Sequence, residues 1–444
     1  MTAPNPPDAA PRPLTHRRVL RIALPIVLSN ATVPILGAVD VGVVGQMGEA
    51  APIGAVAMGA IILTSVFWVF GFLRMGTVGL VGQAAGAGDG AEVSAWLTRA
   101  LLVALAGGGL LIALQWPIFW AAFALSPASE EVERLARLYL GIRIWTAPAA
   151  IAVYALTGWL VAMERTGGVF WVQLVMNTVN IALSILFVLG LEMGVAGVAL
   201  STVIAELLGA ALGLWFCRDA FRHPAWRDWP RIVLRDKLVR MALLNTDILL
   251  RSAMLMIIFS SFVFLGARFG DVTLAANEVL IQFMYITAYA MDGFAFAAET
   301  LIARSYGRRD PGRVRGSALL TSFWGLVVCV VAAAAFWLAG PWLIDLMAKD
   351  ADVQAVARDY LPYMIAAPLI GCAAWMLDGI FIGAARGRDM RNMMALSFVI
   401  YWGAVFALLP LLGNDGLWIA LLVSFAARGV TLGLRYPALE RGAK

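Results

Sequence analysis

Seven acidic side chains lie inside long apolar stretches of this sequence, away from the ends of those stretches. They are Asp40, Glu206, Asp247, Glu278, Asp292, Glu299 and Asp378. An ionisable group inside a bilayer costs about 2.5–3.5 kcal/mol on insertion scales, so such groups are functional candidates by default. Desolvation favours the neutral carboxyl, whereas a positive ligand or water favours the carboxylate. The chemistry that these residue types indicate is therefore cation binding or proton exchange.

The first apolar stretch combines a carboxylate with two prolines. Asp40 lies late in LPIVLSNATVPILGAVDVGVVG, which also contains Pro25 and Pro34. A proline inside a helix removes one backbone hydrogen bond and kinks the helix. We expect a hinge at these prolines and an ion switch at Asp40. A structural Asp at the outer edge of the membrane is the alternative that stays open.

Polar side chains also form two short rows in the fifth and sixth stretches. Asn177, Asn180 and Ser184 are spaced by three and four residues, and Thr202 and Glu206 by four. These spacings place each row on one helical face. Such rows either line an ion or substrate cavity or hold helices together. Both readings stay open from the sequence alone.

The eighth stretch has the longest polar row. Its members follow steps of 4, 3, 4, 3 and 7 residues: Glu278, Gln282, Tyr285, Tyr289, Asp292 and Glu299. They share one helical face, and three carboxylates are difficult to bury as packing alone. We expect this face to line a water-filled cavity, with solvation at the cytoplasmic end as the alternative for Glu299.

Basic residues inside the apolar stretches are expected to neutralise acidic ones. Asp247 and Arg251 are four residues apart, so we expect them to form a structural ion pair. Arg143 is likewise expected to find an acidic partner.

The composition shows what positions these residues. Of 444 residues, 61% are hydrophobic and only 14% are charged, and the mean hydropathy is +0.84. Soluble domains carry about 25% charged residues, so this chain lacks the polar surface that a soluble particle needs. That excludes a soluble enzyme, a disordered protein and a nucleic-acid-binding domain, despite a pI near 9.3. It predicts a multi-span membrane protein.

Twelve apolar segments are each long enough for a membrane helix. They lie at 19–44, 51–80, 95–122, 135–161, 169–190, 195–217, 239–266, 273–303, 315–345, 355–383, 393–412 and 416–436. The fold class is therefore an all-α integral membrane protein with twelve transmembrane helices in two six-helix lobes. The Pro-rich residues 1–14 are expected to form a disordered cytoplasmic tail and not a signal peptide.

The basic residues predict orientation. With the N-terminus in the cytoplasm, 24 of the 33 Lys and Arg fall on the cytoplasmic side, 5 on the other side and 4 within the spans. Cytoplasmic loops carry such an excess, so both termini are expected in the cytoplasm. The domains expected are an N-lobe at 15–217, a basic linker at 218–238 and a C-lobe at 239–444.

The two halves of the chain resemble each other at a nearly constant shift along the sequence. Gly86 and Asp89 match Gly307 and Asp310, and further matches extend over most of each half. Six helices per copy give both copies the same orientation, related by a pseudo-twofold axis along the membrane normal. Two such lobes allow alternating access, in which one lobe rocks against the other.

Several chemistries have no support in the sequence. None of the three lysines follows a glycine, so the chain has no Walker A motif for ATP. Cys217, Cys329 and Cys372 show neither a disulfide framework nor metal-ligand spacing. Neither histidine lies within an apolar stretch, and no HExxH motif occurs. We expect no enzyme activity, cofactor or metal centre, and transport driven by an ion gradient.

Several long segments in order resemble one family. LPIVLSNATVPILGAVDVGVVG, NTDILLRS, AYAMDGFAFAAE, LDGIFIGAARGRDMRN and LLGNDGLWIAL are similar to the multidrug and toxic compound extrusion (MATE) family, its bacterial DinF-type branch in particular. The resemblance implies a multi-pass protein of the bacterial inner membrane. It also implies export of organic, often cationic or amphipathic, compounds in exchange for H+ or Na+.

The resemblance also assigns residues. It implies an ion-coupling site at Asp40, Asn180, Thr202 and the position of Ser184, with helix bending at Pro25. Ser184 stands where some relatives have Asp, which removes a carboxylate from a Na+ cage. The expected coupling ion is therefore H+, and Na+ at Asp40, Asn180 and Thr202 stays open, as does a coupling role for Asp292 or Asp378.

The leading hypothesis is an H+-coupled multidrug exporter that acts as a monomer on small organic substrates in a lipid bilayer, with no nucleic-acid partner. The expected substrate cavity is lined by Asn177, Glu278, Gln282, Tyr285, Tyr289, Asp292 and Asp378. A lipid or lipid-linked glycan flippase is the alternative, but it calls for an Arg-rich cavity and the expected face is acidic. A passive channel also stays open.

Overall fold

The computed structural model describes residues 13–32, 39, 42–46, 50–126 and 128–444. All regular elements within these residues are helices. Eleven helical stretches among them are long and apolar enough to cross a membrane, and the shorter α1 (His16–Asn30) precedes them. The all-α membrane fold with twelve helices in two lobes is confirmed. Asp40, Pro34 and most of the predicted tail lie outside the described residues.

The chain forms two compact units. The C-terminal unit comprises described residues within 1–27, 82–88 and 240–444, and the N-terminal unit those within 28–81 and 89–239. The division therefore passes through α1 between Val27 and Leu28, just after Pro25. The lobe ranges expected from sequence order, 15–217 and 239–444, stay a prediction.

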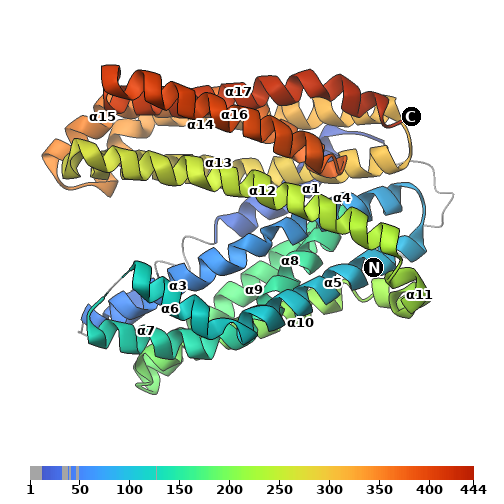
Figure 1. Cartoon of the computed structure of the whole chain (residues 1–444), viewed down its shortest axis with the longest axis horizontal. Coiled ribbons are helices and arrows are strands. Elements are labelled where there is room, and N and C mark those ends of the chain that lie inside the picture. The colour runs from blue at the N-terminus through green and yellow to red at the C-terminus, as the bar shows by residue number, and fades with distance from the viewer. Residues whose placement is uncertain (1–12, 33–38, 40–41, 47–49, 127) are drawn as a thin grey trace. The chain divides into compact units, whose positions relative to one another are not determined.

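The N-terminal unit is a bundle whose helices run through the blue and green part of Figure 1. Helix α5 packs on α8, α3 on α7, and α10 on α7, α8 and α9. The elements that contribute to it after α1 are α3 (Ala50–Trp68), η1 (Val69–Gly71), α4 (Phe72–Gly86), α5 (Gly90–Ala113), α6 (Gln115–Leu125), α7 (Glu130–Arg143), η2 (Ile144–Thr146), α8 (Ala147–Ala162), α9 (Thr166–Ile185), η3 (Leu186–Gly190), α10 (Gly194–Phe216), η4 (Ala220–Arg222), η5 (Pro224–Arg227) and α11 (Trp229–Ile232).

The C-terminal unit has longer helices, drawn from yellow-green to red in Figure 1. Helix α13 packs on α14 and α15, α15 on α14 and α17, and α16 on α17. Its elements are α12 (Arg235–Gly266), η6 (Ala267–Phe269), α13 (Asp271–Gly307), α14 (Pro311–Met347), α15 (Ala351–Gly383), α16 (Gly387–Leu412) and α17 (Asn414–Arg441).

The internal repeat is visible in the helix boundaries. The span Ala50–Gly86 recurs as Asp271–Gly307, and Glu130–Ala162 recurs as Ala351–Gly383, with the same shift at all four ends. The two copies also pack alike, since α9 on α10 corresponds to α16 on α17. The halves therefore share one backbone plan, as the sequence shift predicts.

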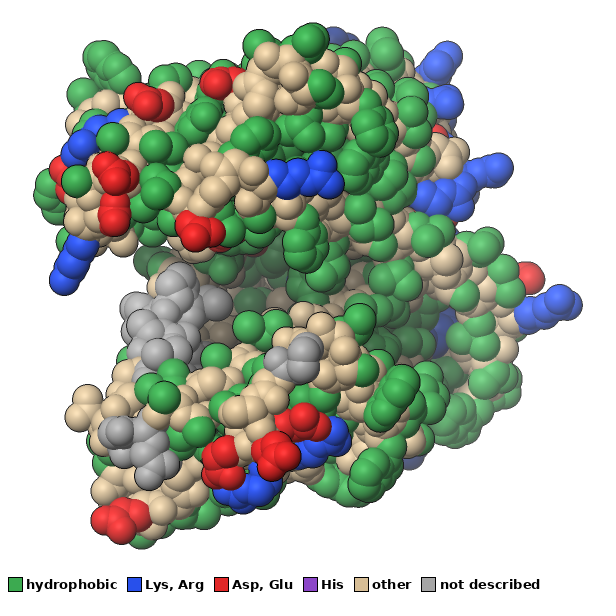
Figure 2. Space-filling view, turned by 60° about the vertical axis from the view of Figure 1, so that its left-hand side comes forward, with side chains coloured by type: hydrophobic (Ala, Val, Ile, Leu, Met, Phe, Trp, Pro, Cys, Tyr) green, Lys and Arg blue, Asp and Glu red, His purple; other side chains and the backbone are tan. Residues whose placement is uncertain are grey.

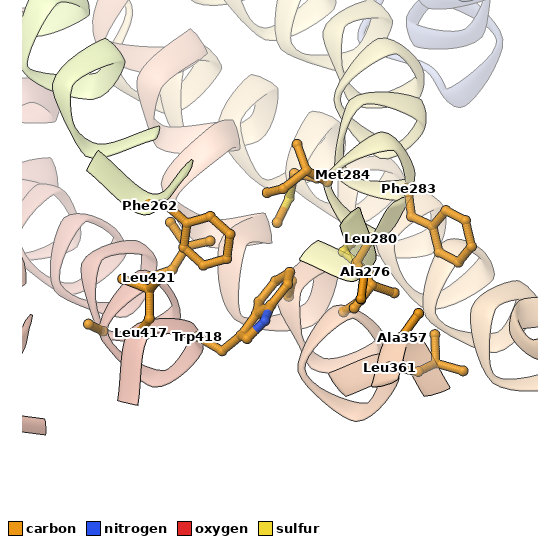
Figure 3. Packing of buried hydrophobic residues seen from close by; sticks show 14 of the residues in the cluster. Phe262, Ala276, Leu280, Phe283, Met284, Ala357, Leu361, Leu417, Trp418 and Leu421 are labelled. Atoms are coloured by element: carbon orange, nitrogen blue, oxygen red, sulfur yellow. The ribbon is translucent and has the colours of Figure 1, made fainter. Parts of the chain in front are cut away.

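A Trp-centred core holds one end of the C-terminal unit together. Figure 3 shows Trp418 between Phe262 and Ala276. The Trp418 and Phe262 rings meet edge to face with centroids 4.8 Å apart, an arrangement that aromatic quadrupoles favour. The indole Nε1 donates to Asn277 Oδ1 at 2.9 Å, and the Asn277 and Asn414 amides bond to each other. The core therefore leaves neither the indole N–H nor these amides without a partner.

The outer surface of each unit is apolar. Hydrophobic side chains cover much of the face visible in Figure 2, and the exposed ones include Trp116, Trp337, Leu338 and Phe406. Such a surface is unfavourable in water and suits lipid chains.

The segment after α10 is attached to α5 by a buried arginine. Arg99 donates from Nε to the Ile232 oxygen at 2.9 Å and from Nη2 to the Arg231 oxygen at 2.6 Å, and its Nη1 pairs with Glu92 at 2.8 Å. Thr98 adds a hydrogen bond to the Trp226 oxygen. These bonds give the basic linker a fixed place on the N-terminal unit.

Asp219 makes a second attachment for this segment. Its carboxylate accepts a hydrogen bond from Arg165 Nη2 at 2.7 Å. Partial burial opposes ionisation, but the bond and charge of Arg165, with the charges of Arg222 and Arg218, hold the pKa of Asp219 below its usual value.

Two glycines allow α13 to touch, backbone to backbone, the last residues of α4, which belong to the C-terminal unit. A Cβ on Gly86 would lie 2.2 Å from the Arg304 oxygen, and a Cβ on Gly307 would lie 2.0 Å from the Gln83 oxygen. The internal repeat relates the two pairs to each other. The contact is therefore reciprocal and has no room for any side chain.

We expect Gly307→Ala to lower the free energy of unfolding by about 1–3 kcal/mol or more, because overpacking forces the backbones apart. The measurement is the thermal midpoint of the detergent-purified protein, followed by Trp fluorescence. Gly403→Ala on α16 is the matched control, since nothing lies within 4 Å of its added Cβ. Equal midpoints for the two variants would contradict the close contact.

Candidate ion-coupling site

A row of buried polar side chains runs along α9 in the N-terminal unit. Asn177 and Asn180 are both buried, and their spacing of three residues places them on one face of the helix. Asn177 Nδ2 donates to Thr32 Oγ1 at 2.7 Å, and Asn177 Oδ1 accepts from Gln173 at 2.8 Å. Thr32 donates in turn to the Ser29 oxygen at the end of α1. Asn177 therefore links α9 to the residues that follow α1.

One side-chain atom of Asn180 makes no hydrogen bond among the described residues. Its Nδ2 donates to Thr202 Oγ1 on α10 at 2.9 Å, and Thr202 donates to the Val198 oxygen at 3.0 Å. Asn180 Oδ1 is buried without a hydrogen-bond partner among the described residues. Leaving a buried acceptor unpaired costs about 1–3 kcal/mol. This oxygen therefore offers a position for a proton donor or a cation.

Ser184 lies one turn further along α9, and its hydroxyl is hydrogen-bonded to another protein side chain. Its hydroxyl shares a hydrogen bond of 2.6 Å with Ser201 Oγ, and Ser201 donates to the Val198 oxygen. The three hydroxyls near Asn180 thus already have partners. Hard cations such as Ca²⁺ take six or more oxygen ligands, so the described residues supply little of a cation cage.

Glu206, the remaining polar residue of α10, is neutralised. Arg143 Nη2 and the Thr146 hydroxyl both bond to its carboxylate, and Arg143 Nη1 donates to Tyr139 at 3.0 Å. The expected acidic partner of Arg143 is confirmed. Of the two readings for Glu206, helix attachment is the one its contacts support.

The polar row of α13 is unevenly buried. Gln282 and Tyr285 are exposed, whereas Glu278, Tyr289 and Asp292 are half-buried. Glu299 is buried at 2% exposure, so the reading of Glu299 as a solvated end group is wrong: neighbouring helices cover this part of α13. The members of the row that precede Glu299 are thus less deeply buried than Glu299.

Asp378 lies in a charge cluster between three helices of the C-terminal unit. Arg251 Nη2 of α12 bonds to its Oδ2, and Arg428 Nε of α17 lies 3.8 Å from the same oxygen. All three side chains are buried. This carboxylate is held by two guanidinium groups, and the sequence had indicated no partner for Asp378.

Asp247 and Arg251 do not form the expected pair. Asp247 Oδ1 instead accepts from Arg391 Nη1 on α16 at 2.6 Å, while Arg251 reaches Asp378. Spacing on one helix brings the two side chains to one face, but residues from other helices supply the partners. The expected Asp247–Arg251 neutralisation is therefore wrong, although both residues are in ion pairs.

Pro25 lies within α1, and the helix continues through it. On the C-terminal unit, Gly293 of α13 meets the same helix, since a Cβ there would lie 2.6 Å from the Ala23 oxygen. Next to this contact along α13 is Asp292. The proposed hinge residue thus follows a closely packed segment of α1.

Sequence reasoning missed several residues of these clusters, and Gln173, Thr146 and Arg391 are among them. Arg428, Thr32 and Ser201 each bond or pair with a predicted site residue. The one available signal was for Arg428, a basic residue within an apolar stretch.

Comparisons with known proteins agree with this architecture. A protein-family model described as MatE matches residues 25–186 and 248–407. The chain is 38% identical to DNA damage-inducible protein F of Escherichia coli (strain K12) over 428 residues, 94% of this chain and 91% of that relative. It is 27% identical to the probable multidrug resistance protein NorM of Bradyrhizobium diazoefficiens, covering 95% and 93% of the two chains. The solved structure of the Vibrio cholerae MATE transporter VcmN in the bent form has the same fold, with a TM-score of 0.85 at 18% identity over 96% and 97%.

The charge cluster around Asp378 gives a stability prediction. We expect Asp378→Asn to lower the free energy of unfolding by about 3–5 kcal/mol, because it leaves two buried guanidinium groups without their carboxylate. The matched control is Asp345→Asn, which breaks the exposed Arg358–Asp345 pair of the same unit and should cost about 0–1 kcal/mol. Thermal unfolding in detergent measures both, and equal losses would contradict the cluster's structural role.

Proposed function

This chain belongs to the MATE family of multidrug efflux transporters, and on that premise we propose that it exports organic, often cationic or amphipathic, compounds in exchange for H+. We further propose that it acts as a monomer in the bacterial inner membrane, with both termini in the cytoplasm. Its relatives are transporters, and no catalytic role is assigned to any residue.

The observation that carries the coupling proposal is the unpartnered Asn180 Oδ1 among the described residues. A protonated carboxyl can donate to this oxygen, whereas a carboxylate can only accept. When no cation is bound there, Asn180 thus favours a neutral, protonated neighbour over an ionised one. The family resemblance assigns Asp40 as that neighbour, so proton loading at Asp40 would be stabilised by a bond that is lost on ionisation.

The ion pairs narrow the choice of coupling carboxylate. Glu206, Asp247 and Asp378 are each held by an arginine. A carboxylate that neutralises a buried arginine cannot leave it without a large cost. Because Arg143 and Arg251 are buried, Glu206 and Asp378 are poor candidates for ion exchange, and we assign the coupling role to Asp40.

Substrate binding in this proposal falls to the half-buried and exposed members of the α13 row. Glu278, Tyr289 and Asp292 supply negative charge and an aromatic face, which together attract organic cations. Proton release from Asp40 toward the cytoplasm and substrate loading then alternate, with bending at Pro25 as the conformational step.

The test is uptake of a fluorescent organic cation into inverted membrane vesicles with an acidic lumen. We expect uptake by the wild-type protein and by Asp345→Asn, the exposed control. Asp40→Asn should reduce uptake to the level of vesicles without the transporter, because Asn cannot exchange a proton. Asn180→Ala should reduce it in part.

A Na+ gradient imposed without a pH gradient separates the two coupling ions. No uptake is expected under that gradient. Uptake driven by Na+ alone, or an Asp40→Asn variant that still follows the pH gradient, would overturn H+ coupling at Asp40.

A further inference from the structure

A buried cluster with an unbalanced charge lies between α12, α15 and α17 of the C-terminal unit. We call it the two-arginine cluster, and its members are Arg251, Asp378 and Arg428, one on each helix. Arg251 Nη2 bonds to Asp378 Oδ2, and Arg428 Nε lies 3.8 Å from the same oxygen. Among the described residues, these are the only ion pairs that either arginine forms. Two positive charges therefore share one negative charge.

Arg428 lacks hydrogen-bond acceptors. Its distance of 3.8 Å from Asp378 Oδ2 is too long for a hydrogen bond, and its Nε is buried without a partner among the described residues. The Phe425 ring centroid is 5.9 Å from Arg428 Cζ, at the outer limit of a cation–π contact. Arg251 Nε is likewise buried and unpartnered. The cluster thus has N–H groups of both arginines left to donate.

This state is unusual among the buried arginines of the described chain, which are Arg99, Arg143, Arg251 and Arg428. Arg99 pairs with Glu92 and also donates to two backbone oxygens. Arg143 donates to Glu206 and to Tyr139. Arg251 donates to Asp378 and to Ser252. Arg428 donates no hydrogen bond to any described residue, so helix attachment alone does not account for it.

Burial makes the unbalanced charge costly. The Arg428 and Arg251 side chains are 3% and 9% exposed, so little water reaches them. A guanidinium cannot lose its proton in a protein, and an unpaired buried charge is strongly unfavourable. The two-arginine cluster therefore needs one further negative charge.

We propose that the two-arginine cluster binds one small monovalent anion, such as chloride. One such anion cancels the excess charge and accepts hydrogen bonds from N–H groups of Arg428 and Arg251, which are stronger for charged partners. The packing beside Arg428 favours a small ion, since a Cβ on Gly429 of α17 would lie 3.2 Å from Ala373 Cβ of α15. This site is separate from the proposed proton coupling at Asp40.

The test uses the full-length protein in detergent, with chloride replaced by gluconate at equal ionic strength so that screening stays constant. A ligand that binds only the folded state raises the thermal midpoint. We expect the wild-type midpoint, followed by Trp fluorescence, to be higher in chloride by about 2 °C or more. Crystals grown with bromide are expected to show one anomalous peak in contact with Arg428.

Arg428→Met separates anion binding from helix attachment. It leaves Arg251 and Asp378 as a balanced pair, and apolar side chains of similar volume often replace members of buried ion clusters without loss of stability. We therefore expect this variant to match or exceed the wild-type midpoint in gluconate and to show no response to chloride. Arg251→Met leaves Arg428 and Asp378 as the balanced pair and should also lose the response.

Arg358→Met is the matched control, because Arg358 also pairs with an aspartate of this unit but at an exposed position. It should keep the full chloride response. Equal wild-type midpoints in chloride and gluconate would overturn the proposal. So would a chloride response that persists in Arg428→Met, a response lost in Arg358→Met, or bromide crystals without a peak at Arg428.

Discussion

The absence of water from the hydrocarbon core is the constraint on which this structure depends. A buried polar group there must find its partner within the protein. Hydroxyls of the helices therefore bond to backbone oxygens one turn away, as Thr287 does to Phe283. Buried arginines likewise form ion pairs with carboxylates, and Arg99 donates hydrogen bonds to backbone oxygens of the linker. A group that stays unpaired under this constraint among the described residues, such as Asn180 Oδ1, is a candidate position for an ion or ligand.

The two halves show how one backbone plan carries different chemistry. Their helices begin and end at matching positions, yet Glu206 of α10 corresponds to Arg428 of α17 at the equivalent place in the repeat. The N-terminal unit pairs its acidic residue with Arg143, whereas the C-terminal unit surrounds Asp378 with two arginines. The two units thus tie different helices together with their ion pairs, although equivalent helices pack alike.

Hydropathy and periodicity predicted the spans, the repeat and the polar faces well, because these follow from the local sequence and the thickness of a bilayer. They could not predict partners. Asp247 and Arg251 share a helical face, but each pairs with a residue on a helix much later in the chain. The third span also breaks at Leu114, between α5 and α6, which apolar composition alone does not reveal.

The division of α1 between Val27 and Leu28 bears on how the protein is made. Synthesis proceeds from the N-terminus, and domains generally fold as units in that order. Here the C-terminal unit includes residues within 1–27 and the segment 82–88, so these parts leave the ribosome long before the helices on which they pack. Gly86, for example, packs against the backbone of Arg304. Arg304 is translated only after all the helices from α5 to α12 have been made. The first half is therefore inserted with segments still lacking their packing partners, and the arrival of the last helices completes the C-terminal unit.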